Sequence, residues 1–376
     1  MNIAINTRFL LKDKLEGIGW FTHETMKRIT RNHPDHQFYF FFDRNFPDEF
    51  IFSKNIEPLV LHPQSRHPVL WYWWFEHSLS VALKKVNADL FISTDGFLSL
   101  STDVKTLLVI HDIAFEHFPE TIGKLTRWYL KKYSPQFARK ADRIATVSEF
   151  SKQDIMKTYG IASEKIDVVY NGAKENYKPH PAIEIKSVIE KFGLHDQYFI
   201  YAGAIQPRKN VTNLLLAFEE FKKKNPGSVR LVIAGRKAWQ FEDVMQTHER
   251  MQFRDDVIFT GHLSTDDLSK LMSGALAMVY VSKFEGFGIP LIEAMNCGTP
   301  VITSNVSSMP EVAGDAALLV NPNSASEIAE AMEKISKDDQ LRKTLIVKGN
   351  IQKQKFSWDK TAESLWRSAE KILNEK

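Results

Sequence analysis

Short apolar segments alternate with amphipathic stretches along the whole chain. This alternation is typical of β-strands separated by helices, the arrangement that builds parallel sheets. In the first half, apolar residues at helical spacing predict helices over Trp20–Arg31 and Leu125–Phe137. The strands predicted from the apolar segments are Asn2–Asn6, Phe38–Phe42, Asp89–Ser93, Lys105–Ile110, Arg143–Val147, Ile166–Tyr170, Tyr198–Ala202, Arg230–Ala234, Val257–Thr260, Leu276–Val281, Pro300–Ile302 and Ala317–Val320.

The alternation is interrupted at residues 171–181, which contain an Asn-Gly pair, two prolines and few large aliphatic side chains. Such a stretch is typical of a linker, and 376 residues are enough for two domains. We therefore predict an α/β protein of two tandem Rossmann-like, doubly wound domains that face a cleft, over residues 1–178 and 179–355. Residues 356–376 form a helix too apolar for a free tail, which we expect to return to the first domain.

Composition narrows the classes of partner. The formal net charge of +3 is small and gives no reason to expect nucleic acid as a partner. The single cysteine, Cys297, excludes an internal disulfide and a cysteine-rich metal site. No segment approaches the roughly 20 apolar residues of a transmembrane helix, and the first ten residues lack the pattern of a signal peptide. We expect a cytoplasmic protein.

The clearest chemical motif is the sequence EGFGIPLIE at residues 285–293, which follows a predicted strand and opens a helix. Its two glycines allow close approach of backbone to a ligand, and the N–H groups and dipole of the following helix favour an anion. The turn is therefore a candidate diphosphate site. Glu293 could accept hydrogen bonds from a ribose, and Glu285 from a second polyol. The alternative is that both are ordinary acids beside a glycine-shaped loop.

The segment from Phe259 to Gly314 strongly resembles the retaining glycosyltransferases of family 4, which have the GT-B architecture. The hallmark of that family is a pair of glutamates separated by seven residues, here Glu285 and Glu293. The resemblance covers nearly the whole chain. Further matches are Gly17-Ile18-Gly19, His111-Asp112, Ala145–Ser151, Asn171-Gly172 and Pro207-Arg208-Lys209-Asn210.

The resemblance implies a nucleotide-diphosphate sugar as donor, bound mainly by the second domain. Cations beside the leaving diphosphate stabilise the transition state more than the ground state. Many relatives carry an arginine directly after the glycine that follows the first strand of this domain, where this chain has Ala204, and we expect Arg208 to replace it. The implied catalytic residues are His111, Arg208, Lys209 and Glu285. The implied donor-binding residues are Gly17, Gly19, Gly203, Gly286, Phe287, Gly288, Ile289, Glu293 and Met309, with Gly17 and Gly19 in a flexible loop over the diphosphate.

Each short motif also has a structural interpretation. Residues 208–209 could form a solvated basic loop, and His111 could make only a structural hydrogen bond. No two aspartates are separated by one residue, the usual pair of metal-dependent glycosyltransferases, so we expect no metal and no cofactor. A non-catalytic sugar-nucleotide-binding protein is an alternative of another class. A nicotinamide-dependent enzyme is disfavoured because no Gly-x-Gly-x-x-Gly follows a strand.

The implied reaction is retaining transfer of a hexose to a glycan or lipid-linked acceptor. The downstream segments look most like bacterial mannosyltransferases, which favours GDP-mannose over UDP-glucose. Retention could proceed by same-face attack or through a covalent glycosyl-enzyme.

Two segments point to surfaces rather than to chemistry. The aromatic run Trp71–Phe75 favours packing over an acceptor platform. Residues Lys124–Arg143 hold seven basic residues and one acid; this stretch either contacts an anionic membrane surface at the inner face or forms a solvated helix face.

Overall fold

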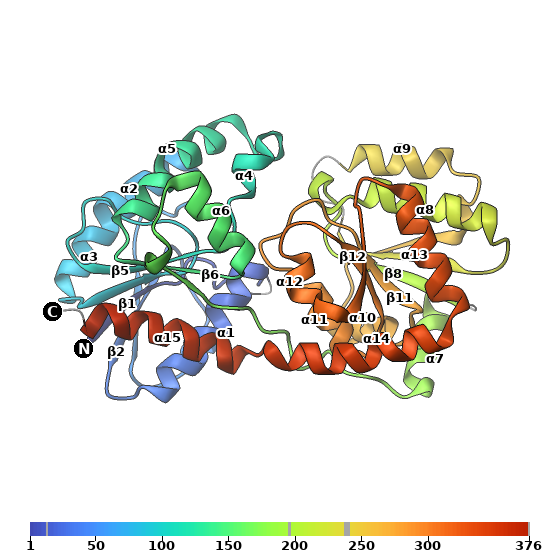
Figure 1. Cartoon of the computed structure of the whole chain (residues 1–376). Helices are drawn as coiled ribbons and strands as arrows, with labels where there is room; N and C mark the ends of the chain where they lie inside the picture. Colours follow the sequence, from blue (N-terminus) through green and yellow to red (C-terminus); the bar gives the residue numbers. More distant parts are fainter. Residues whose placement is uncertain (13, 195–196, 237–240, 375–376) are drawn as a thin grey trace. The chain divides into compact units, whose positions relative to one another are not determined.

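The computed structural model describes residues 1–12, 14–194, 197–236 and 241–374. The chain divides into two compact units (Figure 1). Unit 1 comprises Met1–Asn171 and Trp358–Lys376, and unit 2 comprises Gly172–Ser357. The boundaries predicted from the sequence, after residues 178 and 355, differ from these by seven and two residues. Unit 2 is thus inserted into unit 1.

Unit 1 contains a seven-stranded sheet in the order β3-β2-β1-β4-β5-β6-β7, in which all neighbouring strands are parallel. The chain builds outwards from β1 in one direction and then in the other, so the topological switch point lies between β1 and β4. Ligands of such sheets bind beyond the carboxyl ends of the strands at this point. The strands are β1 (Asn2–Asn6), β2 (Gln37–Phe42), β3 (Ile56–Val60), β4 (Leu90–Ser93), β5 (Lys105–Ile110), β6 (Arg143–Thr146) and β7 (Ile166–Val168).

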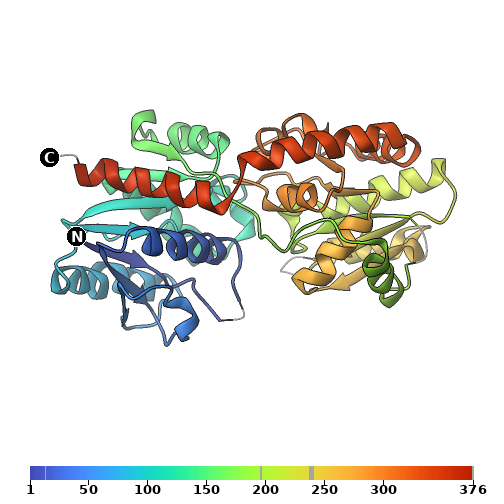
Figure 2. The ribbon, with the colours of Figure 1, turned by 90° about the horizontal axis from the view of Figure 1, so that it is seen from below.

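Helices cover both faces of this sheet (Figures 1 and 2). One large apolar core joins strand residues such as Phe91 and Leu108 to Trp74, Phe75 and Phe137 from the helices. The helical segments of unit 1 are α1 (Gly17–Asn32), η1 (Asp48–Phe50), α2 (Pro68–Trp73), the π-turn η2 (Trp74–Leu79), α3 (Ser80–Lys85), α4 (Ala114–His117), η3 (Pro119–Thr121), α5 (Lys124–Lys140), α6 (Glu149–Tyr159), η4 (Ser163–Lys165) and α15 (Trp358–Asn374).

Unit 2 repeats the design with six parallel strands in the order β10-β9-β8-β11-β12-β13, and its switch point lies between β8 and β11. The strands are β8 (Tyr198–Ala202), β9 (Arg230–Ala234), β10 (Val257–Gly261), β11 (Ala277–Tyr280), β12 (Val301–Ser304) and β13 (Ala317–Val320). The helical segments are α7 (Ala182–Lys191), η5 (Pro207–Lys209), α8 (Val211–Lys224), α9 (Glu242–Arg250), η6 (Arg254–Asp256), α10 (Thr265–Gly274), α11 (Ile289–Asn296), α12 (Met309–Ala313), η7 (Gly314–Ala316), α13 (Ala325–Lys337), α14 (Asp339–Gln352) and η8 (Lys353–Lys355). The prediction of two doubly wound α/β folds is confirmed.

The last helix, α15, packs in unit 1 beside α1 (Figure 2). Its buried residues recur at helical spacing and face α1 and the central strands; they include Leu365, Trp366 and Ile372. The indole of Trp366 stacks on the ring of His33 with centroids 3.9 Å apart. At the start of the helix, the Thr361 hydroxyl donates to the Tyr170 carbonyl at 2.6 Å. The helix is therefore an integral part of the unit 1 fold.

One strand was missed by the sequence analysis for a physical reason. Strand β3 contains Pro58, which removes a backbone donor and argues against a strand. The structure places β3 at the edge of the sheet, next to β2 only, where proline is tolerated.

Truncating Trp366 to alanine should lower the free energy of unfolding by roughly 3 kcal/mol, because it removes a buried aromatic side chain and leaves a cavity. Urea unfolding followed by circular dichroism measures this change. The matched control is Arg367→Ala one position along, where an exposed side chain pairs with exposed Glu363, and it should shift stability by less than about 1 kcal/mol. Equal effects of both substitutions would contradict the packing role of α15.

Candidate active site

The loops that follow β8 and β11 meet at the switch point of unit 2. The carboxylate of Glu285 accepts hydrogen bonds from Arg208 Nη1 at 3.0 Å, Lys209 Nζ at 2.5 Å and the Tyr280 hydroxyl at 2.9 Å. Lys209 Nζ also donates to the Tyr280 oxygen at 2.7 Å. The adjacent residues Arg208 and Lys209 thus form one network with Glu285, which lies more than seventy residues further along the chain.

Asn210 fixes the turn that carries the two cations. Its backbone adopts the left-handed conformation, with φ of 61°, which asparagine tolerates better than most residues. Its buried side-chain amide donates to the carbonyls of Val281, at 2.9 Å, and Pro322, at 2.7 Å. In addition, the Lys283 N–H donates to the Arg208 carbonyl at 2.9 Å. The turn is therefore bonded directly to the loop that carries Glu285.

The network is ionic although it is buried. Burial alone would raise the pKa of Glu285, which is only 6% exposed, but the charges of Lys209 and Arg208 outweigh it and lower the pKa to about 2. Burial and the nearby carboxylate raise the pKa of Tyr280, which keeps the phenol neutral. Near neutral pH, one carboxylate thus lies between two cations and a neutral hydroxyl.

The glycine turn between β11 and α11 packs tightly against α12. Gly288, with φ of 105°, precedes α11, and a Cβ at this position would lie 2.4 Å from Met309 Cε. The Ser308 hydroxyl is within hydrogen-bond distance of two carbonyls of the turn, Glu285 O at 2.9 Å and Phe287 O at 2.8 Å. Gly286 and Phe287 are buried, and Ile289 begins the helix. The turn is closely packed against α12 and leads into the N-terminus of α11.

Glu293 lies in α11, apart from the Glu285 network. It is half-buried, and Tyr177 donates a hydrogen bond to its side chain. Burial raises the pKa of Glu293 to about 7, against opposing effects of Lys174 and Tyr177. The structure therefore holds a carboxyl group near its titration point at physiological pH, an arrangement more often found at functional sites than elsewhere.

In unit 1, His111 follows β5, next to the switch-point strand β4. Its Nε2 lies 2.9 Å from the Thr94 carbonyl oxygen, which can only accept, so Nε2 carries a proton. Its ring contacts Phe21 edge-on, with centroids 4.9 Å apart. Burial lowers the pKa of His111, so the imidazole is neutral and held in one tautomer.

Gly17 and Gly19 lie in the first turn of α1 and not in the loop that the sequence predicted. A Cβ at Gly19 would lie 2.7 Å from the Phe9 carbonyl oxygen, whereas nothing lies within 4 Å of one at Gly17. Glycine at position 19 is thus required by close packing. In unit 2, Gly203 follows β8, and its carbonyl oxygen would lie 1.8 Å from a Cβ at Gly235.

Several residues of the site were missed in the sequence. Tyr280 lies at the end of β11, inside the predicted strand Leu276–Val281, and aromatic residues in strands are common without any function. Ser308 and Tyr177 belong to no recognisable motif. Gly235 directly follows β9, just as Gly203 directly follows β8. A glycine at this position could have indicated a close approach of the two backbones.

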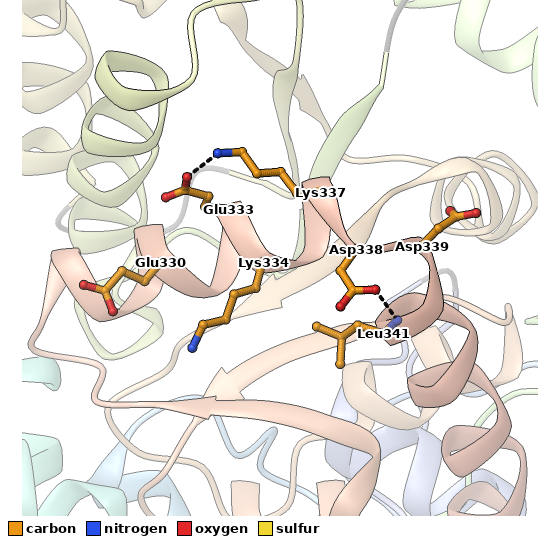
Figure 3. Close-up of a pocket in the computed structure, with 7 residues that line it drawn as sticks. All are labelled: Glu330, Glu333, Lys334, Lys337, Asp338, Asp339 and Leu341. Atoms are coloured by element: carbon orange, nitrogen blue, oxygen red, sulfur yellow. Dashed lines mark hydrogen bonds and ion pairs between the residues drawn. The ribbon is translucent and has the colours of Figure 1, made fainter.

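In the part of the chain that the structure describes, no group of three or more His, Cys, Asp or Glu side chains is arranged to hold a metal ion. Within the same residues, no helix is long and apolar enough to cross a membrane. Figure 3 shows a hollow between α13 and α14, where Lys337 pairs with Glu333 and Asp338 accepts from the Leu341 N–H at 2.8 Å. This hollow is a helix junction and contains none of the predicted site residues.

Comparison with known proteins agrees with this architecture. Residues 15–176 match the family model of Glycosyltransferase Family 4, and residues 183–352 match that of Glycosyl transferases group 1. The structure of Anabaena Alr3699/HepE, solved in complex with UDP-glucose, superimposes with a TM-score of 0.76 at 18% identity, over 99% of this chain and 100% of that chain.

Two relatives are closer in sequence. The chain is 32% identical to O-antigen chain mannosyltransferase B of Escherichia coli, over 68% of this chain and 67% of that protein. It is 33% identical to O-antigen chain mannosyltransferase RfbU of Salmonella typhimurium, over 71% of each. The chain therefore belongs to the GT-B glycosyltransferases, with a family 4 and a group 1 domain. Within that class it resembles mannosyltransferases of O-antigen synthesis.

The raised pKa of Glu293 predicts a pH-dependent stability. The folded-state pKa of about 7 exceeds the ordinary value of 4.5. The protonated Glu293 carboxyl therefore makes its full contribution to stability below pH 4.5, and this contribution is lost as pH rises through 7. Glu293→Gln, which cannot ionise, should gain on the order of 3 kcal/mol in unfolding free energy relative to the wild type between pH 4.5 and pH 8, since each pKa unit corresponds to about 1.4 kcal/mol. Urea unfolding at both pH values measures the difference. A difference that does not vary with pH would show that Glu293 ionises normally.

Proposed function

We propose that this glycosyltransferase moves a hexose, mannose in the first instance, from a nucleotide-diphosphate donor to a glycan or lipid-linked acceptor, with retention and without a metal. The observation that carries the proposal is the network of Arg208, Lys209 and Glu285 at the switch point of unit 2. It places two cations at the place where doubly wound folds bind their ligands.

The two cations suit a leaving diphosphate. Negative charge develops on the diphosphate as the glycosidic bond breaks, and fixed cations stabilise that charge without reorganising during the reaction. Glu285 supplies the fixation, since its carboxylate accepts from Lys209 and Arg208 together. We propose this positioning role for Glu285 in addition to the sugar contact implied by the family resemblance. Arg208 and Lys209 then supply the charge that a metal supplies in other transferases.

We propose that the nucleotide extends from the glycine turn along α11, with the diphosphate at residues 286–289 and Met309, and the ribose at Glu293. Two ribose hydroxyls would donate to the ionised carboxylate, so donor binding should lower the pKa of Glu293. A half-buried carboxyl group that lowers stability at neutral pH is consistent with a role of Glu293 in binding rather than in folding.

Unit 1 contributes the acceptor side in this proposal. The neutral His111, fixed through Nε2, would direct its Nδ1 side toward a sugar hydroxyl. The family resemblance implies contact of His111 with the transferred sugar. For Gly17 and Gly19 it implied a loop over the diphosphate; because both lie in α1, we propose instead that the first turn of this helix approaches the diphosphate. The anomeric configuration of the transferred sugar would be retained.

The donor is tested by a panel of GDP-mannose, UDP-glucose and an ADP-sugar. Each is incubated with the protein, and binding, hydrolysis and transfer to a lipid-linked acceptor are measured. GDP-mannose is expected to be preferred because the sequence relatives are named as mannosyltransferases. Preference for UDP-glucose, which is bound in one structural relative, would contradict GDP-mannose as the donor. The proposed binding site would be unaffected by that result. Binding without turnover of any donor would favour a non-catalytic sugar-nucleotide-binding protein.

Glu293→Ala should weaken binding of the bare nucleoside diphosphate by roughly tenfold to a hundredfold, because hydrogen bonds to a charged group are worth about 1.5 to 3 kcal/mol. Isothermal titration calorimetry with GDP and UDP measures the effect. Glu330→Ala, an exposed glutamate in α13, is the matched control and should bind normally. An unchanged affinity of the Glu293 variant would contradict the proposed contact between Glu293 and the ribose.

Lys209→Ala should reduce turnover more than donor affinity, because the charge that Lys209 stabilises grows in the transition state. The expected loss in kcat is on the order of a hundredfold, about 3 kcal/mol. Lys223→Ala on α8, whose exposed side chain pairs with Glu219, serves as the control. Excess EDTA should leave the wild-type activity intact. Activity that chelation abolishes and Mg²⁺ restores would overturn the metal-free proposal.

A further inference from the structure

Two neighbouring helices of unit 1 expose large apolar side chains to solvent. On α2 the exposed fractions are 63% for Val69, 43% for Tyr72 and 54% for Trp73. On α5 they are 53% for Leu125 and 55% for Trp128. Trp73 and Trp128 are the only exposed tryptophans among the described residues. We call these five residues and the basic side chains around them the α2–α5 face.

The exposed side chains form one continuous surface. Val69, Tyr72 and Trp73 follow helical spacing and share a side of α2. Tyr72 and Trp128 both lie beside the ring of Tyr133 on α5, with centroid distances of 6.0 Å and 6.3 Å. Figure 1 shows α2 and α5 next to each other, in agreement with their contacts. The opposite side of the same segment is anchored, since Trp74 is fully buried.

The charges around this surface are almost all positive. Residues 123–140 contain no acid, and residues 66–85 contain only Glu76. The Glu76 carboxylate accepts from the backbone N–H groups of Leu100, at 2.8 Å, and Ser101, at 3.1 Å. The exposed basic residues of these two segments are Arg66, Lys84, Lys85, Lys124, Arg127, Lys131, Lys132, Arg139 and Lys140.

Lysine and aromatic side chains are interleaved on α5. Lys132 Nζ lies 5.1 Å from the ring centroids of both Trp128 and Tyr133. Lys131 is 3.7 Å from the Glu116 carboxylate, a partly exposed pair that contributes little to stability. The helix therefore presents cations at the same level as its exposed indole ring and leaves them accessible to an external anion.

We infer that the α2–α5 face docks unit 1 on the surface of an anionic lipid bilayer. A lipid interface suits both the exposed aromatic side chains and the cations of this face. Indole and phenol rings are favoured at headgroup depth, and lysines are attracted to acidic headgroups. A soluble polyanion would use the cations and leave the apolar side chains in water. The inference does not depend on the proposed donor, because docking needs no nucleotide.

The test is flotation of the full-length protein with vesicles, without donor or acceptor. Vesicles of phosphatidylethanolamine with 30% phosphatidylglycerol, about one charge in three lipids as a working choice, are compared with pure phosphatidylcholine. Three double variants are used: Trp73→Ser/Trp128→Ser, Lys124→Glu/Lys132→Glu and, as the matched control on exposed residues of α14, Val347→Ser/Ile351→Ser. Circular dichroism confirms that each variant is folded.

Wild type and the α14 control are expected to bind the anionic vesicles and not phosphatidylcholine. Each of the two variants in the α2–α5 face should lower the partition coefficient by about tenfold or more. The inference is overturned if the wild type does not float, if the tryptophan variant floats like the wild type, or if the α14 variant loses binding equally. Retention on heparin without vesicle binding would assign the face to a soluble polyanion and would also overturn it. Transfer to a water-soluble acceptor should be unchanged in both variants, so loss of docking and failure of the transferase proposal are distinguishable.

Discussion

The buried ion pairs of Glu285 with Lys209 and Arg208 hold the candidate site together. They connect the loop after β8 to the loop after β11, two segments more than seventy residues apart in the chain. A buried carboxylate is stable only when it is paired and hydrogen-bonded, and this one has two cations and the Tyr280 hydroxyl. The same bonds that satisfy Glu285 fix the positions of the cations. Removing Glu285 would therefore leave two buried or half-buried cations without their shared counter-charge.

This arrangement gives the two glutamates of the motif different electrostatic states. Glu285 is ionised because cations surround it, whereas Glu293 is near its titration point because burial dominates its environment. The sequence presents them as a matched pair, eight positions apart. Their functions are best considered separately: Glu285 orders charges that are already present, and Glu293 offers an acceptor whose charge a ligand can complete.

The sequence predicted the parallel α/β architecture because hydrophobic periodicity depends on local order. The strands Asn2–Asn6, Lys105–Ile110 and Tyr198–Ala202 have the predicted bounds. The loop at Gly17 and Gly19, expected from the family resemblance, was wrong, because α1 begins three residues before the predicted helix and includes both glycines. The sequence could not pair Lys209 with Tyr280, because no local signal specifies which strand end lies beside which loop. Strand order decides that, and strand order depends on the whole sheet.

The position of α15 has a consequence for protein synthesis. Unit 2 is complete once residue 357 has left the ribosome, whereas unit 1, although begun first, lacks α15 until residues 358–374 have emerged. Until then, the surface of α1 that Trp366 and its neighbours cover remains exposed to water. The half of the protein that is translated first is thus the last to finish folding, and a nascent chain stalled before residue 358 would display an uncovered hydrophobic surface that chaperones recognise.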